Sequence, residues 1–118
     1  MVNIFVVEDE LLICEVYRYF FEITGHNVVR IARNGLEAIQ MFKTLEAESD
    51  VVIMDYRMPR MDGMAAAQEI RAMTSEHLRI IFVSADPLIK EKVMVDGAAG
   101  FLAKPFSFRD LLALIENQ

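Results

Sequence analysis

Charged and hydroxyl side chains follow four apolar segments of this sequence. They are Glu8-Asp9 and Asp55 after two of the segments, and Ser84 and Lys104 after two others. A charge at the end of a buried segment needs a partner or a function, because burying an unpaired charge costs free energy. Three carboxylates gathered at one place repel one another unless a hard cation such as Mg²⁺ (or Mn²⁺) binds between them. These residue types indicate a divalent-metal site with a hydroxyl and a lysine beside it.

Apolar segments of strand length alternate with amphipathic helical patterns along the whole chain. The predicted strands are Ile4–Val7, Val28–Ala32, Val51–Met54, Ile80–Val83 and Gly100–Ala103. Three of them are continuously apolar, as expected when helices cover both faces of a sheet. The segments between them have the length of the crossover helices in βαβ units. The sequence therefore predicts one α/β domain over residues 1–118, with a doubly wound parallel sheet of five strands and five helices.

Residues that favour helix ends bound four of the predicted helices. Gly is common just after a C-terminus, whereas Asn, Asp and Ser are common N-caps. The signals are Gly25 after a helix over Leu11–Thr24, Asn34 before a helix from about Gly35, Asp86-Pro87 before a helix that runs to Gly97, and Ser107 with Asp110 before the last helix.

In doubly wound folds the ligand crevice lies beyond the carboxyl ends of the strands, where the strand order reverses. The residues that directly follow the strands can reach this crevice, so the acids, Ser84 and Lys104 are expected to converge there. Each of them alone has an ordinary explanation, as a loop acid near a helix N-terminus, a strand-end cap, a turn residue or a solvated charge. Their joint placement at one edge of the sheet favours a functional site.

Composition restricts the class of protein. The chain has 118 residues, of which 54% are hydrophobic and 25% charged, as is typical of a globular domain. A formal charge of −6 without a basic stripe argues against direct nucleic-acid binding. The apolar runs are too short to cross a membrane, and the N-terminus lacks a signal-peptide pattern. For this reason we expect no membrane insertion. The single Cys14 cannot form an internal disulfide, so we expect a cytoplasmic protein.

The remaining side chains with reactive or metal-binding potential favour structural roles. His26 and His77 lie in predicted loops without metal-ligand spacing and are expected at the surface. Cys14 lies in the first helix and is expected to be packed, because no base flanks it. The eight Met residues are dispersed, which is typical of core filler, and Met58-Pro59 belongs to the loop after Asp55.

Four motifs carry a resemblance to a known family. VVEDE, VVIMDYRMPRMDG, IIFVSAD and GFLAKPF occur in the order and spacing of the receiver domain of two-component response regulators. The resemblance extends from Asn3 to Asn117. Within the family, the chain resembles the single-domain chemotaxis-type regulators. It implies a flavodoxin-like sheet of order 2-1-3-4-5.

The resemblance also implies a role for each site residue. Asp55 would accept a phosphoryl group, and Asp9, Asp55 and the backbone carbonyl of Arg57 would ligate Mg²⁺, with Glu8 acting through a bound water. Lys104 and Ser84 would contact the phosphoryl oxygens. The Lys104–Pro105 bond would be cis and direct the lysine into the site, although only about 5–6% of X–Pro bonds in folded proteins are cis.

A signalling switch with protein partners is the implied function, rather than an enzyme with a separate substrate. The donor would be a sensor histidine kinase, a phosphotransfer protein or a small phosphodonor, and the reader a protein target or a fused output domain. Ser84 and Phe101 would transmit the change, although Phe101 also suits a plain core position. The responding face would comprise parts of Pro87–Val95, Phe101–Ala103 and Ser107–Ile115. Arg57 and Asp86 either pair and tune the phosphoryl lifetime or are two independent exposed charges.

Three other interpretations remain. A pseudo-receiver would share the fold and bind partners without taking phosphate. A flavodoxin-like flavin binder would want a Gly- and Ser/Thr-rich loop where this chain has Glu8-Asp9-Glu10. A haloacid-dehalogenase-like phosphatase would have an Asp two residues after the nucleophile, where this chain has Arg57.

Overall fold

The computed structural model describes residues 1–44, 49–58, 61–74 and 78–117. The described residues form one parallel sheet of five strands in the order β2-β1-β3-β4-β5, which confirms the predicted topology. The strands are β1 (Asn3–Val7), β2 (Asn27–Ala32), β3 (Val51–Asp55), β4 (Arg79–Ser84) and β5 (Gly100–Ala103). Asp55 and Ser84 are therefore the last residues of their strands, where the sheet holds their backbone in place.

Five α-helices connect and cover the strands. They are α1 (Leu11–Ile23), α2 (Gly35–Thr44), α3 (Gly63–Met73), α4 (Lys90–Val95) and α5 (Phe108–Glu116). The predicted helix ends are present: Gly25 has φ of 86°, Asn34 Oδ1 accepts from Glu37 N–H at 2.8 Å, and Ser107 Oγ accepts from Asp110 N–H at 3.1 Å. Side-chain caps and a left-handed glycine satisfy backbone groups that a helix end leaves unpaired.

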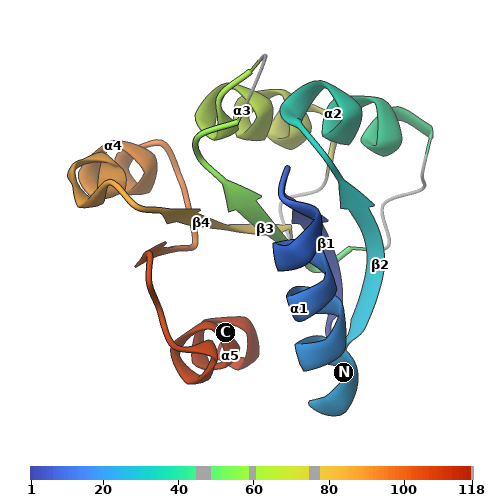
Figure 1. Ribbon diagram of the computed structural model, residues 1–118. Helices are drawn as coiled ribbons and strands as arrows, with labels where there is room; N and C mark the ends of the chain where they lie inside the picture. Colours follow the sequence, from blue (N-terminus) through green and yellow to red (C-terminus); the bar gives the residue numbers. More distant parts are fainter. Residues whose placement is uncertain (45–48, 59–60, 75–77, 118) are drawn as a thin grey trace.

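The sheet separates two apolar cores. On one face, β1, β3 and β4 side chains pack against Tyr17 and Phe21 of α1 and against Leu111 and Ile115 of α5. On the other face, α2, α3 and α4 supply the covering residues, which include Phe42 and Ile70. Figure 1 shows these two layers, with α1 and α5 together and α2, α3 and α4 on the opposite side. Helices on both faces explain why β3 and nearly all of β1 and β4 are buried.

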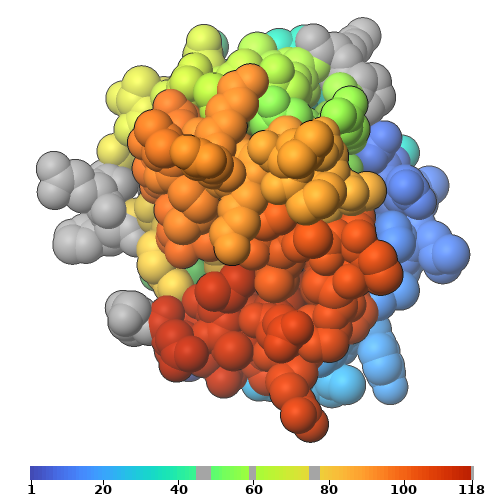
Figure 2. Space-filling view, turned by 90° about the vertical axis from the view of Figure 1, so that its left-hand side faces the viewer, coloured from blue at the N-terminus to red at the C-terminus, as the bar shows by residue number. Residues whose placement is uncertain are grey.

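The helix that was expected from Pro87 to Gly97 is shorter and irregular. Pro87–Ile89 form a 3₁₀ turn, η1, and the α-helix begins only at Lys90. The segment ends at Gly97, whose φ is 107°. In Figure 2, residues of α4 (orange) lie above those of α5 (red) on the same face of the molecule.

Two expectations about side chains were wrong in part. His26 lies in the loop before β2, but it is buried, because its ring is held between the start of β1 and the end of α5. The methionines were expected to fill the core. Met54 is in the core and four further methionines pack against that core, but Met1, Met73 and Met94 are exposed. Cys14 is buried as expected, whereas His77 and Pro59 lie outside the described residues. None of the described helices has the length and apolarity that a membrane span requires.

Candidate functional site

Three carboxylates meet at the carboxyl edge of the sheet. Glu8, Asp9 and Asp55 each offer an oxygen, and these oxygens lie within 4.8 Å of one another. Glu8 and Asp55 are 1% and 5% exposed, and Asp9 is half-buried. Glu8 Oε2 accepts from the backbone N–H of Glu10 at 3.1 Å, whereas the buried Oε1 of Glu8 has no hydrogen-bond partner. Such an oxygen-rich set, with a spare buried acceptor, fits a hard divalent cation.

The lysine after β5 reaches the same carboxylates. Lys104 Nζ lies 3.3 Å from Asp55 Oδ1 and 3.7 Å from Glu8 Oε1. Lys104 N–H also donates to the carbonyl of Ser84 at 2.8 Å, which continues the pairing of β5 with β4. The Lys104–Pro105 peptide bond is cis, as the resemblance implies. A single lysine charge faces three acids, so the site carries an excess of negative charge.

Burial and mutual repulsion change the acidity of two of these carboxyl groups. Burial raises the pKa of Glu8 to about 7, with a further increase from Asp55 and an opposing effect of Lys104. Burial also raises the pKa of Asp55, although the Lys104 ammonium opposes this increase. Without a metal ion, the cluster therefore retains protons at a pH where ordinary carboxyl groups have lost them.

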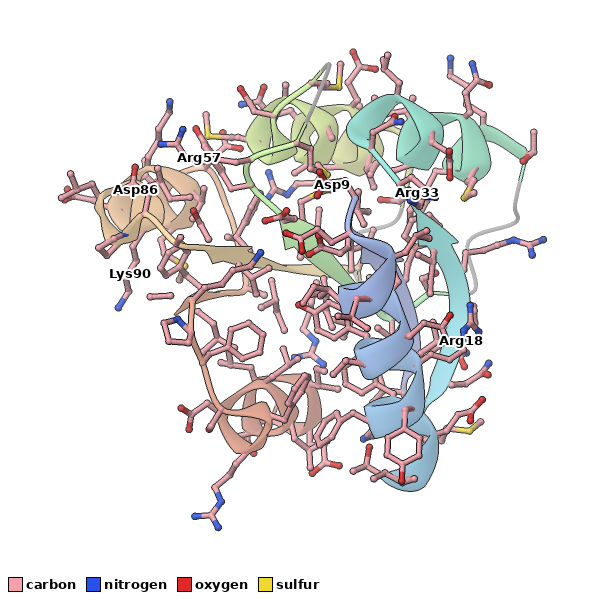
Figure 3. The ribbon with its side chains drawn as sticks, in the orientation of Figure 1. Asp9, Arg18, Arg33, Arg57, Asp86 and Lys90 are labelled. Atoms are coloured by element: carbon pink, nitrogen blue, oxygen red, sulfur yellow. The ribbon has the colours of Figure 1, made fainter. Side chains whose placement is uncertain are left out.

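A short polar network connects the hydroxyl at the end of β4 to the loop after β3. Asp86 N–H donates to Ser84 Oγ at 3.1 Å, and Asp86 Oδ1 accepts from Leu88 N–H at 3.0 Å. Asp86 Oδ2 accepts from Arg57 Nη2 at 3.0 Å. Figure 3 shows Arg57 and Asp86 as neighbours across the rim of the site. The sequence left open whether Arg57 and Asp86 form an ion pair or are independent exposed charges. The structure shows the ion pair, with the Arg57 side chain 70% exposed.

Phe101 occupies the second strand position of β5, opposite Phe82. Its side chain is half-buried and packs against the core beneath α2, α3 and α4. The ring is therefore a packing residue that also has some contact with solvent.

Three supporting residues were not predicted from the sequence. Asp62 caps α3 by accepting from Ala65 N–H at 2.8 Å. The next residue, Gly63, packs so tightly that an added Cβ would lie 2.6 Å from the carbonyl oxygen of Asp55. Arg33 Nη2 donates to the backbone carbonyl of Asp9 at 3.3 Å, and Figure 3 shows the two side by side. The Asp-Gly pair before an apolar helix was a signal for the first two, whereas no sequence signal identifies Arg33.

A comparison with protein families matches residues 4–116 to the response regulator receiver domain. This chain belongs to the response regulator receiver family. Receivers are phospho-accepting switches of two-component signalling, and the acidic crevice described above is the candidate site of this receiver. The chain is 34% identical over 118 residues to a probable C4-dicarboxylate response regulator, DctR, of Priestia megaterium, covering 98% of this chain and 50% of the relative.

Other relatives and solved structures agree. The transcriptional regulatory protein PdtaR of Mycobacterium tuberculosis is 33% identical over 114 residues, which cover 97% of this receiver and 55% of the relative. A receiver domain structure from Clostridium thermocellum is 31% identical with a TM-score of 0.89, over 99% and 93% of the two chains. A Thermotoga maritima response regulator, TrrA, in complex with Mg²⁺ and beryllium fluoride is 30% identical with a TM-score of 0.82, over 95% and 94%. The receiver spans about half the length of the curated relatives it matches.

Proposed function

We propose that this receiver takes a phosphoryl group on Asp55 and reports it by a change in the face formed by η1, α4, β5 and α5. The observation that carries the proposal is the arrangement around Asp55. This buried carboxylate ends a central strand, belongs to a cluster of three acids and faces Lys104 at 3.3 Å. A nucleophile held by a rigid strand beside a compensating charge suits phosphoryl transfer, in which positioning and charge stabilisation dominate.

In the proposed transfer, an Asp55 oxygen forms a bond to phosphorus while the bond from phosphorus to the donor breaks. The donor atom, a histidine nitrogen or an acyl oxygen, leaves with the electron pair. Asp9, Asp55 and the backbone carbonyl of Arg57 would hold Mg²⁺ (or Mn²⁺), with Glu8 bound through a water. The ion, when bound, neutralises negative charge on the carboxylates and on the phosphoryl oxygens. Lys104 provides a second positive charge, and the Ser84 hydroxyl donates a hydrogen bond to a phosphoryl oxygen.

The proposed donor protein is a sensor histidine kinase or a phosphotransfer protein that presents helices. The outer side of α1 supports this class of partner, because four apolar side chains with a spacing of four, three and four residues are exposed there. They are Leu12 (74% exposed), Val16 (39%), Tyr19 (68%) and Ile23 (64%). Such a stripe matches the contact pattern of two packed helices. The exposed Glu15, Arg18 and Glu22 flank it, so this border of the stripe carries two acids and one base.

An apolar groove adjoins this stripe. It has a volume of about 460 Å³ and runs between α1 and the segment after β5, with Ile13, Val16, Phe106 and Phe108 among its walls and Lys104 at its end. A side chain of the donor protein that enters this groove would bring the donor's phosphorylated group close to Asp55. The stripe and the groove together would form the donor-binding surface.

The proposed response begins when Ser84 and Lys104 move toward the phosphoryl group. The space left by Ser84 lets Phe101 turn inward, and the surface around α4, β5 and α5 changes. A protein target or an output domain then binds this surface with a different affinity in the two states. The receiver promotes its own phosphorylation and dephosphorylation and has no separate substrate. We propose the cytoplasm as its location, because Cys14 is a free thiol.

The direct test is incubation with Mg²⁺ and acetyl phosphate, followed by intact mass and by the lability of the product to acid and base. The wild-type chain should gain one phosphoryl group with the lability of an acyl phosphate, and Asp55→Asn should gain none. Asp62→Asn is the matched control, because it neutralises a nearby acid outside the cluster, and it should label normally. A wild-type chain that gains no phosphoryl group would instead support the alternative of a pseudo-receiver that binds partners without phosphorylation.

A further inference from the structure

The C-terminal end of α4 is tied to α3 on the side of the molecule away from the acidic crevice. Arg71 Nη1 donates to the backbone carbonyl and to Oδ2 of Asp96, both at 3.0 Å. Gln68 Nε2 donates to the other carboxylate oxygen of Asp96 at 3.1 Å. The side chains of Arg71 and Asp96 are 27% and 25% exposed, so solvent screens this ion pair only partly. Three hydrogen bonds thus converge on Asp96, the residue that directly follows α4.

The C-terminal end of α5 is tied in a similar way. Arg79, the first residue of β4, donates to the carbonyls of Leu114 at 2.9 Å, Ile115 at 2.6 Å and Asn117 at 3.0 Å. His26 Nδ1 accepts from Val2 N–H at 3.0 Å, so His26 Nε2–H donates to Glu116 Oε2 at 2.8 Å. A cation at the C-terminus of a helix pairs with carbonyls that the helix leaves free. Both helices of the responding face therefore have a side-chain anchor at this end.

The opposite ends of these helices lie next to the crevice and are held in different ways. The N-terminal end of the η1–α4 segment is attached through Asp86, whose bonds go to Ser84 Oγ and to the largely exposed Arg57. The N-terminal end of α5 has the cap from Ser107, and the ring of Phe108 there packs against Tyr17 and Phe20 of α1. The position of these ends follows from the topology, because a helix that follows a parallel strand begins at the carboxyl edge of the sheet and ends at the other edge.

We propose that η1–α4 pivots about its C-terminal anchor on Arg71, so that the responding face opens at its crevice end. The inference rests on the proposed phosphorylation of Asp55 and deepens it by naming the fixed point. When Ser84 Oγ turns toward the phosphoryl group, its bond with Asp86 N–H is lost and the N-terminal end of η1 is released. Leu88, which is 87% exposed at that end, then moves far, whereas Val95, 82% exposed beside the Asp96 anchor, moves little.

Amide chemical shifts, measured before and after labelling with Mg²⁺ and acetyl phosphate, test the pivot. The decisive residues are Val95 and Gly97, which lie beside the anchor and far from the phosphoryl group. Their shift changes should be small in the wild-type chain and should grow several-fold in Arg71→Ala, because that variant frees the C-terminal end of α4. Arg109→Ala, which removes an exposed cation of α5, is the matched control and should behave as the wild type. Each protein is compared with its own unlabelled form, so static effects of the substitution cancel.

If Arg71→Ala does not fold, Asp96→Asn is the second variant that weakens the anchor. It removes the ion pair and keeps the side-chain volume. Large shift changes at Val95 and Gly97 in the wild-type chain would overturn the pivot, as would equal changes in the anchor variants and in Arg109→Ala. Intact mass separates the two proposals. Labelled proteins without the expected pattern refute the pivot alone, and proteins that gain no phosphoryl group refute the proposed function and the pivot with it.

Discussion

Lys104 Nζ lies 3.3 Å from Oδ1 of Asp55, so the ammonium group already neutralises part of the charge of the proposed nucleophile. The same ammonium lies 3.7 Å from Glu8 Oε1, which makes it a common counter-ion for both buried acids. Because it is a positive charge beside a proposed cation site, it repels a divalent ion while it stabilises a transferred phosphoryl group. The two effects have opposite signs and can be measured separately.

Replacing Lys104 by Met keeps much of the side-chain shape and removes the charge. We expect labelling by acetyl phosphate to slow by on the order of 10²-fold, the usual cost of losing one group that stabilises transition-state charge. Mg²⁺ should bind more tightly at pH 8, because the competing cation is gone. Labelling rates from mass spectrometry and calorimetric titration with Mg²⁺ provide the two measurements. Lys90→Met on α4 is the control and should change neither, whereas weaker Mg²⁺ binding in Lys104→Met would contradict the repulsion argument.

Stability without metal should depend on pH because of Glu8. Its pKa is raised from 4.5 to about 7, mainly by burial, so between these values the folded chain holds a proton that the unfolded chain has lost. The free energy of unfolding in EDTA should therefore fall by about 2–3 kcal/mol as the pH rises from 4.5 to 8. Asp55, whose pKa is also raised, adds to the fall. Urea unfolding at several pH values measures it.

Two additions sharpen this pH experiment. Glu8→Gln should flatten most of the dependence, whereas Glu91→Gln, an exposed acid of α4, should leave it unchanged. Saturating Mg²⁺ should also remove the fall, because the ion binds the ionised carboxylates of the folded chain. A free energy of unfolding that rises with pH in EDTA would contradict the assignment of Glu8 as a buried acid with raised pKa.

The Arg57–Asp86 ion pair should affect the lifetime of the phosphoryl group more than the stability of the fold. Arg57 is 70% exposed, so its replacement by Ala should cost less than about 1 kcal/mol. If the pair screens the approach of the hydrolytic water, Arg57→Ala should lose phosphate several-fold faster and Arg57→Lys only slightly faster. Loss of phosphate after removal of the donor is the measurement. An unchanged rate in Arg57→Ala would remove the lifetime role.

Phe101→Ala separates signal transmission from phosphorylation. Labelling by acetyl phosphate should be retained, because the ring does not belong to the acidic cluster, whereas phosphate-dependent binding of a partner should be blunted. Removing a half-buried ring should also lower stability by about 1–3 kcal/mol. Binding of the partner to labelled and unlabelled chains measures the transmission, with Phe101→Tyr as the matched aromatic control. Undiminished phosphate-dependent binding in Phe101→Ala would leave the ring a core residue only.

The apolar stripe of α1 should matter for protein donors and not for small ones. Tyr19→Glu places a charge in the stripe and should slow transfer from a phosphorylated histidine-containing protein by tenfold or more, on the order of a 1.4 kcal/mol loss of binding. Labelling by acetyl phosphate should be unchanged, because Tyr19 is distant from the acidic cluster along α1. Leu36→Glu on α2 alters an exposed apolar residue outside the stripe and is the control. Equal slowing in both variants would disconnect the stripe from the donor.

Several parts of the site were predictable because they depend on local pattern and on one rule of topology. Continuous apolar segments identified the central strands, and parallel strands bring their carboxyl ends to one edge. Glu8, Asp55, Ser84 and Lys104 follow from these two facts together. The exposed side of α1 was not predictable, because Leu11–Ile23 is apolar on several sides and the sequence does not say which side a neighbouring element covers.

Contacts between distant segments account for the rest. From the sequence alone, His26 is expected to be an exposed polar residue of a loop. It is buried instead, in contact with Glu116, 90 residues further along the chain. The anchors of Arg71 on Asp96 and of Arg79 on the last carbonyls of α5 likewise join separate elements. The sequence by itself determined the alternation of strands and helices and the residue types at the crevice, because these follow from short-range periodicity. Only the tertiary structure decided the partners of these long side chains, because their free energy depends on how closely packed helices bring groups together across the fold.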